Sequence, residues 1–238
     1  MVNPGFHRTV RSKDTAGGMR PDTLFIACSA LGKEVRTIIQ KYGWSAHFIP
    51  LDSRYHLYPM KIEGAVEKCL NDTDTDGYRR RIVVYGHCGA QNLDAILARH
   101  AGAVRPVGPH CYEMYGGEDF RKAVKEVPGT YILTDYLVQA WDKLIVRGLK
   151  LNKHPKLTKV MFAHYKRMIY FAQEERDALV GKARAIANSL GLELIVRPVG
   201  YGDLELRLVA IMEGRPQPGA DAEAADYAYP TAVGPARS

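Results

Sequence analysis

Three of the four cysteines follow apolar runs of strand length, a position from which thiols can hold a metal ion. Cys28 ends the run TLFIAC, Cys88 lies in YGHCG just after the run RIVV, and Cys111 follows a short apolar stretch in VRPVGPHCYE. Grouped thiolates select zinc, cuprous copper or an iron–sulfur cluster over magnesium or calcium. We therefore predict that these three cysteines are ligands of one metal site.

Histidines adjoin two of these cysteines and are the candidate catalytic groups. His87 precedes Cys88, and His110 precedes Cys111. Side chains of adjacent residues usually point apart, so an imidazole next to a ligand is more often an acid/base or supporting group than a further ligand. We predict a proton-transfer role for both histidines.

Glycines lie on both sides of the second thiol. Gly86 and Gly89 enclose the His-Cys pair. The missing side chains permit unusual backbone conformations and leave space for a bulky cofactor beside the thiol. Gly116 and Gly117 are expected to leave similar space after the third cysteine. We therefore assign Gly86 and Gly89 to cofactor binding.

Two metal chemistries fit three thiolates, and the sequence leaves both open. An iron–sulfur cluster (4Fe-4S) held by three cysteines keeps one iron open to a substrate oxygen or nitrogen. A zinc ion held by three thiolates keeps one position at which a substrate thiol is deprotonated and becomes a nucleophile. Either site would act on a small-molecule substrate. A module that stores or delivers metal without catalysis is the competing interpretation.

The fourth cysteine and the absence of several known motifs limit which kinds of site the sequence can form. Cys69 lies on the apolar face of a predicted helix in AVEKCLND and is interpreted as a core residue. The sequence contains no CxxC pair and no GxSxG, P-loop or GxGxxG motif. Four thiols in a chain without a secretory signal are typical of ligands or buried residues rather than of a disulfide framework.

Apolar runs of strand length alternate with amphipathic segments of helix length between residues 22 and 213. The predicted strands are 23–28, 46–51, 81–86, 130–134, 167–173 and 193–199, with weaker ones at 103–106 and 206–212. The predicted helices are 31–43, 60–70, 92–100, 117–126, 135–147, 157–165 and 177–191. This alternation indicates a single α/β domain, a mainly parallel sheet with helices on both faces. Ligands bind beyond the carboxyl ends of parallel strands, so the three thiols are expected at one edge of that sheet.

The ends of the chain and its charge complete the prediction. Residues 1–21 and 214–238 lack apolar periodicity, and we predict a flexible arm and a disordered tail. The sequence contains no long apolar window and no signal peptide, so we expect a cytoplasmic protein without a membrane partner. The net charge of +7 permits an anionic partner. We expect Lys150, Lys153 and Lys156 to be solvated, and we do not expect nucleic acid binding, because aromatic residues are not interleaved with the basic ones.

The segments ACSAL, YGHCG, PHCYE and PGTYILTDYL together resemble the bacterial and archaeal family catalogued as domain of unknown function 1638, over roughly residues 22–200. The resemblance assigns the family's three cysteines to Cys28, Cys88 and Cys111, and it adds Tyr85 to the cofactor-binding positions. It also implies an association with corrinoid proteins and methyltransferases, and hence a role in one-carbon or methyl transfer metabolism. A non-catalytic module on which a corrinoid protein docks and a zinc-dependent, thiol-activating methyltransferase are the alternatives.

Overall fold

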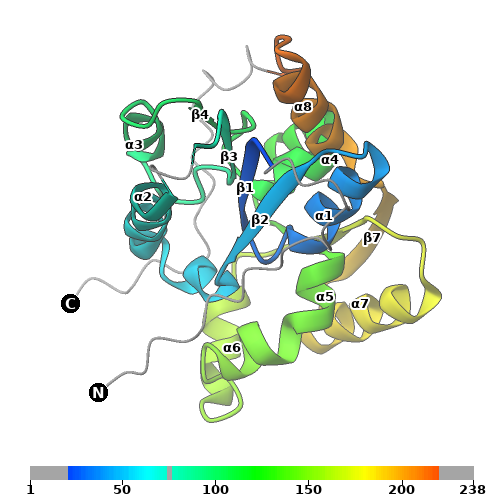
Figure 1. Cartoon of the computed structure of the whole chain (residues 1–238). Coiled ribbons are helices and arrows are strands. Elements are labelled where there is room, and N and C mark those ends of the chain that lie inside the picture. The colour runs from blue at the N-terminus through cyan, green and yellow to red at the C-terminus, as the bar shows by residue number, and fades with distance from the viewer. Residues whose placement is uncertain (1–20, 74–76, 220–238) are drawn as a thin grey trace. The chain divides into compact units, whose positions relative to one another are not determined.

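The computed structural model describes residues 21–73 and 77–219. The chain divides into two compact units, Met1–Pro106 and Val107–Ser238, which we call the first and the second unit. Each unit has its own parallel sheet with helices packed against it (Figure 1). The predicted α/β class with parallel strands is confirmed, and the strands are divided between two sheets. The predicted arm and most of the predicted tail fall outside the described residues.

In the first unit, the described strands form a four-stranded parallel sheet in the order β2-β1-β3-β4. Its elements are β1 (Thr23–Cys28), α1 (Gly32–Lys41), β2 (Ala46–Leu51), the 3-10 helices η1 (Ser53–Leu57) and η2 (Pro59–Lys61), α2 (Ile62–Thr73), β3 (Arg80–Val84), α3 (Leu93–Leu97) and β4 (Ala103–Val104). All six residues of β1 are buried, because a central strand of a parallel sheet is covered on both faces. This explains why TLFIAC is an almost continuous apolar run.

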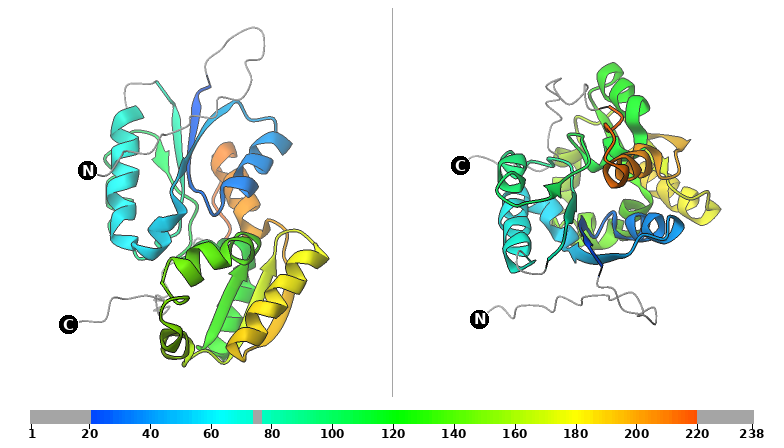
Figure 2. Two further views of the ribbon diagram at one scale, coloured as in Figure 1. Left: turned by 90° about the horizontal axis from the view of Figure 1, so that it is seen from below. Right: turned by 45° about the horizontal axis from the view of Figure 1, so that its top comes forward.

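The connections place helices on both faces of this sheet. β2 pairs with one side of β1, whereas β3 pairs with the other side. Because parallel crossovers are right-handed, this change of direction puts α1 on one face and α2 on the opposite face, as Figure 2 shows. The loops after β1 and β3 therefore lead away from each other. The carboxyl ends of these two strands form a topological switch point, the usual ligand position in an open parallel sheet.

The second unit has a three-stranded parallel sheet in the order β5-β6-β7. Its elements are α4 (Cys111–Glu126), β5 (Thr130–Thr134), α5 (Asp135–Trp141), the π-helical segment η4 (Asp142–Arg147), α6 (Pro155–Phe162), β6 (Arg167–Ala172), α7 (Asp177–Leu190), β7 (Glu193–Pro198) and α8 (Gly202–Glu213). The strands follow one another in one direction, so right-handed crossovers place α5, α6 and α7 on one face. α4 covers the opposite face, where Phe120 packs with Ile132 and Phe171, and α8 packs on α4.

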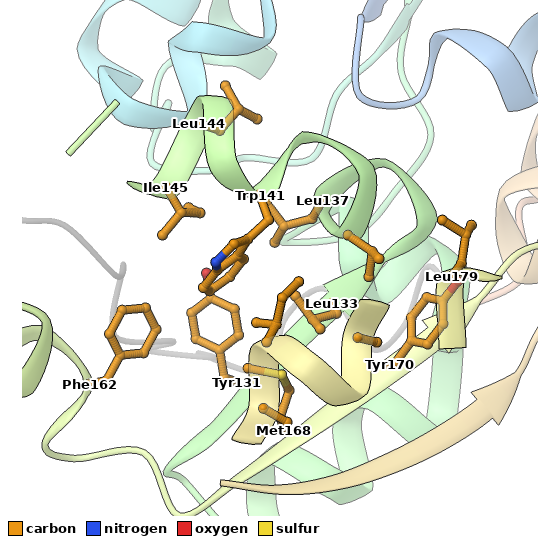
Figure 3. Close-up of a cluster of buried hydrophobic side chains, with 14 of the residues drawn as sticks. Tyr131, Leu133, Leu137, Trp141, Leu144, Ile145, Phe162, Met168, Tyr170 and Leu179 are labelled. Carbon is orange, nitrogen blue, oxygen red and sulfur yellow. The ribbon is translucent and has the colours of Figure 1, made fainter. Parts of the chain in front are cut away.

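An aromatic cluster fills the core beneath α5, α6 and α7 (Figure 3). The ring centroid of Tyr131 lies 5.8 Å from that of Trp141 and 5.4 Å from that of Phe162. The Phe162 centroid also lies 5.8 Å from that of Tyr165. Phe162 is the buried residue of α6. These contacts therefore fix the short helix α6 to the sheet.

Most predicted elements occur where the sequence indicated them. Three predicted strands coincide with observed ones: 23–28, 46–51 and 130–134. The weaker strand predicted at 206–212 is wrong, because this segment belongs to α8. Leu204 and Leu208 are fully buried, whereas Leu206 between them is 58% exposed. In a strand all three side chains would share one face, so this burial pattern is that of a helix.

Candidate functional site

Cys28 ends β1 at the switch point of the first sheet, as the sequence predicts. It is 1% exposed. The Leu31 N–H donates to the Cys28 carbonyl at 2.9 Å, which turns the chain directly into α1. The next residue is tied to β2, because the Ser29 N–H donates to the Leu51 carbonyl at 2.8 Å. Cys28 is therefore held rigidly at the carboxyl edge of the sheet.

Cys88 lies in a tight turn after the neighbouring strand β3. The Ala90 N–H donates to the His87 carbonyl at 2.6 Å, and the two residues between them, Cys88 and Gly89, have φ angles of 46° and 90°. Positive φ at both central positions is the pattern of a type I′ turn, which prefers Gly, Asn or Asp. A left-handed conformation costs other residues roughly 1–2 kcal/mol. The turn thus presents a half-buried thiol at the expense of stability.

Gly89 faces a proline ring rather than open space. A Cβ at Gly89 would lie 2.9 Å from the Pro59 Cβ, so a side chain there would collide with η2. The close approach of η2 and the positive φ both require glycine at this position. Tyr85 and Gly86, on the other side of the turn, are buried. The assignment of Tyr85, Gly86 and Gly89 to cofactor binding stays a prediction.

His87 is held by a carboxylate and a buried arginine. Its Nε2 atom lies 3.0 Å from Asp94 Oδ2 and 2.8 Å from Arg105 Nη2. Arg105 is 7% exposed. It donates to both carboxylate oxygens of Asp94, at 2.6 Å and 3.0 Å, and to the Pro106 carbonyl at 3.1 Å. This network orients the imidazole through Nε2 and leaves Nδ1 without a hydrogen bond among the described residues.

The charges around His87 are fixed at neutral pH. The hydrogen bond from Arg105 lowers the pKa of Asp94 to about 2, so the carboxylate is ionised. Two proton arrangements fit the distances: either Nε2 of His87 accepts a hydrogen bond from Arg105, or a protonated Nε2 donates to Asp94. In both arrangements Nδ1 is the ring nitrogen that can exchange a proton with a ligand. The acid/base role of His87 stays a prediction.

Cys69 is confirmed as a core residue. It is 8% exposed on α2. Burial raises the pKa of its thiol to about 11. Because the thiolate is the form that attacks electrophiles and binds metals, this shift makes Cys69 less reactive than an ordinary thiol at neutral pH.

His110 and Cys111 begin α4 in the second unit. Cys111 is the first residue of the helix and is 4% exposed, and His110 precedes it with an extended backbone. Backbone N–H groups at a helix N-terminus favour a thiolate. Burial lowers the pKa of His110 to about 4, so its imidazole is neutral at neutral pH. A neutral imidazole can accept a proton or a hydrogen bond, although one with so low a pKa is a weak base.

Buried ion pairs fix the start of α4. Arg207 of α8 is fully buried and donates to the two carboxylate oxygens of Glu113 at 2.5 Å and 2.8 Å. It also donates to the Val107 carbonyl at 2.7 Å. A guanidinium that contacts both oxygens of a carboxylate sets the orientation of both groups. Because Glu113 lies two residues after Cys111, these bonds determine where that thiol lies within the second unit.

The two glycines after Cys111 serve close packing. A Cβ at Gly116 would lie 2.7 Å from the Phe171 ring. Gly117 has a φ of 48° within α4, and a Cβ there would lie 2.9 Å from Asp203 Oδ2. These positions let α4 kink and approach β6 and α8. The expectation that they leave space for a ligand is wrong, because Phe171 and Asp203 fill that space.

A further polar cluster joins the carboxyl ends of β5 and β6. Asp135 is 2% exposed and accepts a hydrogen bond from the Tyr170 hydroxyl at 2.6 Å. It also accepts backbone N–H bonds from Gln173 at 3.0 Å and from Glu174 at 3.1 Å. Burial raises the pKa of Tyr170, which therefore stays protonated and donates. A carboxylate engaged in this way supports the strand ends.

The charged residues that contact the predicted site residues were not predicted from the sequence. Asp94, Arg105, Glu113 and Arg207 were not predicted to have a role, although each contacts or positions a predicted site residue. A signal was present in two cases, because Arg105 and Arg207 interrupt the apolar segments AVRPV and LRLVAIM. A charge within an apolar run indicates a buried ion pair.

The structure brings two of the three predicted ligands to one sheet. Cys28 ends β1 and Cys88 follows β3, and these two strands are hydrogen-bonded neighbours. Cys111 belongs to the second unit, so the joint site of three cysteines stays a prediction. Within residues 21–73 and 77–219, no three His, Cys, Asp or Glu side chains are grouped closely enough to hold a metal ion. The same part of the chain contains no helix long and apolar enough to cross a membrane.

Comparison with known proteins identifies a family. The model of the family described as "Protein of unknown function (DUF1638)" matches residues 50–208, which is more than half of the 238-residue chain. The matched range includes Cys88 and Cys111, whereas Cys28 precedes it. No curated protein and no solved structure matches the chain.

Proposed function

Because the chain belongs to the family of unknown function DUF1638, we propose its function from the chemistry of the site: it is a metal-binding protein that uses cysteine thiolates at the carboxyl edge of the first sheet. Cys28 and Cys88 supply thiolates from the first unit. The third, Cys111, is proposed from the sequence alone. The bound group is zinc or a 4Fe-4S cluster, and either would leave one position open for a small-molecule substrate.

The conformation of Cys88 is the observation that carries this proposal. Its φ of 46° belongs to a turn that Gly or Asn would form with less strain. Residues held in costly backbone conformations cluster at functional sites, where the side chain is needed. The turn also lies at the switch point of the sheet, where ligands bind. A role as ligand or nucleophile explains why a thiol occupies this position.

His87, which precedes Cys88 in the chain, is oriented as a proton carrier would be. Arg105 keeps Asp94 ionised, and together they hold the imidazole through Nε2. Nδ1 can then take a proton from a substrate or return it while the ring stays oriented. A metal ion at the thiolates would supply Lewis acidity to the same substrate. Proton transfer by His87 and Lewis acidity from a metal would together suit a metal-assisted transfer reaction.

The metabolic context of the proposal comes from the family resemblance. It suggests one-carbon or methyl transfer metabolism in the cytoplasm, with a corrinoid protein or a methyltransferase as partner. The +7 net charge is compatible with an acidic protein partner. A module that binds metal and passes it to such a partner, without turning over a substrate, would use the same thiolates.

Metal analysis of protein purified without oxygen tests the proposal. Cys28→Ala, Cys88→Ala and Cys111→Ala should each abolish the metal content, because each removes a bond and a negative charge that the ion requires. Cys69→Ala is the matched control and should retain the metal, since its thiol lies in the core. His87→Ala should also retain it, because the imidazole supplies no metal bond.

The result also distinguishes the two metals. Iron and sulfide with a brown colour support the cluster, and a single zinc in a colourless protein supports thiol activation. Metal content that is the same in all three cysteine variants and in the unsubstituted protein contradicts the proposal.

A second candidate function is a cysteine nucleophile that needs no metal. The half-buried thiol of Cys88 and the preceding histidine, whose imidazole is held by Asp94, favour this alternative. It predicts a metal-free protein in which one equivalent of an electrophilic probe modifies Cys88 rapidly. Modification should slow in His87→Ala and stay unchanged in Cys28→Ala.

A further inference from the structure

A block of positive charge in the second unit is unrelated to the thiols. Residues 143–173 contain eight Lys and Arg residues and no Asp or Glu, although the whole chain has 26 acidic residues. This block alone carries more positive charge than the net +7 of the chain. Such local asymmetry indicates an anionic partner for this surface.

The lysines of this block are exposed, and none of them forms an ion pair with another residue that the structure describes. The two arginines are paired, Arg147 with Asp142 at 2.7 Å and Arg167 with Glu126 at 3.8 Å. No ion pair within the described residues involves the lysines. The six exposed lysines are Lys143, Lys150, Lys153, Lys156, Lys159 and Lys166, and we call them, with Leu157 and Val160, the basic surface.

Two apolar side chains stand among these lysines on α6. Leu157 is 42% exposed and Val160 is 68% exposed. They are three residues apart and therefore share one side of the helix. The helix is anchored by Phe162, which Figure 3 shows beside Tyr131 and Trp141. A pocket of about 490 Å³ adjoins the helix and is lined by Lys153, His154, Pro155, Lys156 and Leu157.

One member of the basic surface, Lys166, lies at the amino edge of the second sheet. The Lys166 N–H donates to the Gly129 carbonyl at 2.7 Å, and these residues directly precede β6 and β5. Asp135 marks the opposite, carboxyl edge. A partner on the basic surface would therefore leave the carboxyl edge of this sheet uncovered. This position suits attachment rather than catalysis.

We propose that the basic surface attaches the protein to an anionic lipid bilayer. Clusters of four to eight basic residues on an amphipathic helix are attracted to anionic headgroups, and apolar side chains among them insert at the headgroup level. Leu157 and Val160 are placed for such insertion. Surface attachment needs no membrane-spanning helix. The proposal thus revises the expectation of no membrane partner, which followed from the absence of a long apolar window and of a signal peptide.

A nucleic acid fits the same surface less well. A phosphate backbone offers no apolar partner for Leu157 and Val160, and the Phe and Tyr side chains of residues 143–173 pack in core clusters instead of being available to stack on bases. Paired hydrogen bonds to phosphate also favour Arg, whereas the unpaired charges here are all Lys.

Sedimentation of the full chain with lipid vesicles tests the proposal. We expect binding to phosphatidylcholine vesicles that contain about a quarter phosphatidylglycerol, no binding to phosphatidylcholine alone, and weaker binding as salt rises. Neutralising Lys153, Lys156 and Lys159 to Gln should weaken binding by about five-fold per lysine, or roughly 100-fold in total. Leu157→Ser with Val160→Ser should weaken it by about ten-fold.

A matched control distinguishes the effect of the basic surface on vesicle binding from the effect of the protein's net charge. Lys122→Gln, Lys125→Gln and Lys182→Gln remove three exposed lysines elsewhere in the second unit. This variant should lose much less affinity than the variant with Lys153, Lys156 and Lys159 neutralised, because it leaves the lysines around Leu157 and Val160 in place. An equal loss in the control would overturn the proposal.

Two further outcomes would also overturn the proposal. One is a protein that stays in the supernatant with anionic vesicles at physiological salt. The other is lysine-dependent binding to duplex DNA that is insensitive to Leu157→Ser and Val160→Ser, which would identify the surface as a nucleic acid site. Circular dichroism of each variant checks that these surface substitutions leave the fold intact.

Discussion

Replacing Cys88 by asparagine should make the first unit more stable even though the thiol is lost. The φ of 46° costs an ordinary residue roughly 1–2 kcal/mol, and Asn is one of the few residues other than Gly that adopt this conformation readily. Cys88→Asn should therefore exceed Cys88→Ala by about 1 kcal/mol in the free energy of unfolding. Cys88→Gly should gain less than this, because glycine adds about 0.4–1 kcal/mol of conformational entropy to the unfolded chain.

The two tryptophans allow this effect to be measured in the first unit alone. Trp44 belongs to the first unit and Trp141 to the second. The Trp44 ring stacks on Phe25 with centroids 5.9 Å apart, so its fluorescence should change when the first unit unfolds. Urea titrations in a Trp141→Phe background would give the free energy of unfolding for each Cys88 variant, provided that the slopes agree.

Gly89→Ala is the control in the same turn. Its φ of 90° and the 2.9 Å approach of a Cβ to Pro59 predict a loss of at least about 1–2 kcal/mol. We therefore expect Asn at position 88 to raise the free energy of unfolding and Ala at position 89 to lower it. If Cys88→Asn is no more stable than Cys88→Ala, the backbone at Cys88 is not strained. The inference that this strain marks a functional thiol would then be wrong.

Three further predictions concern buried and charged groups. Cys69→Ala should cost about 1 kcal/mol in urea titration, and its thiol, with a pKa of about 11, should be alkylated far more slowly than Cys88, as mass spectrometry would show. Arg207→Met should destabilise the second unit by about 3 kcal/mol, because the buried Glu113 loses two hydrogen bonds and keeps the one from Arg121, and adding Glu113→Leu should restore part of that loss. The pKa of Asp94 falls from 3.8 to about 2 on folding, so its contribution to stability is present above pH 3.8 and lost as the pH falls through 2. Asp94→Asn should remove this acid dependence of the urea midpoint, and an unchanged dependence would contradict it.

Local pattern was sufficient to predict most strands, the position of Cys28 at the end of a strand, and the burial of Cys69. TLFIAC is apolar because both faces of β1 are covered, so its end at Cys28 could be located from composition. Cys69 lies at the helical spacing of the buried apolar residues of α2, and this spacing can be read from the local sequence. These features depend on residues within one turn or one strand of each other.

Features that depend on long-range contacts were not predictable. The division into two sheets follows from which strands pair, and the apolar runs alone do not contain that information. The need for Gly89 depends on Pro59, thirty positions earlier, and the position of α4 depends on Arg207, far along the chain. The strained turn at Cys88 went unpredicted for another reason, since a type I′ turn is normally recognised by the Asn or Gly that Cys88 replaces.

X-ray absorption at the metal edge of protein purified without oxygen tests the thiolate site most directly. We expect three sulfur neighbours at about 2.3 Å if the metal is zinc, or four sulfur neighbours for each cysteine-bound iron if it is a 4Fe-4S cluster. The metal signal should be lost in Cys88→Ala but not in Cys69→Ala. A metal surrounded only by nitrogen and oxygen, or a protein without metal, would contradict the proposed thiolate site.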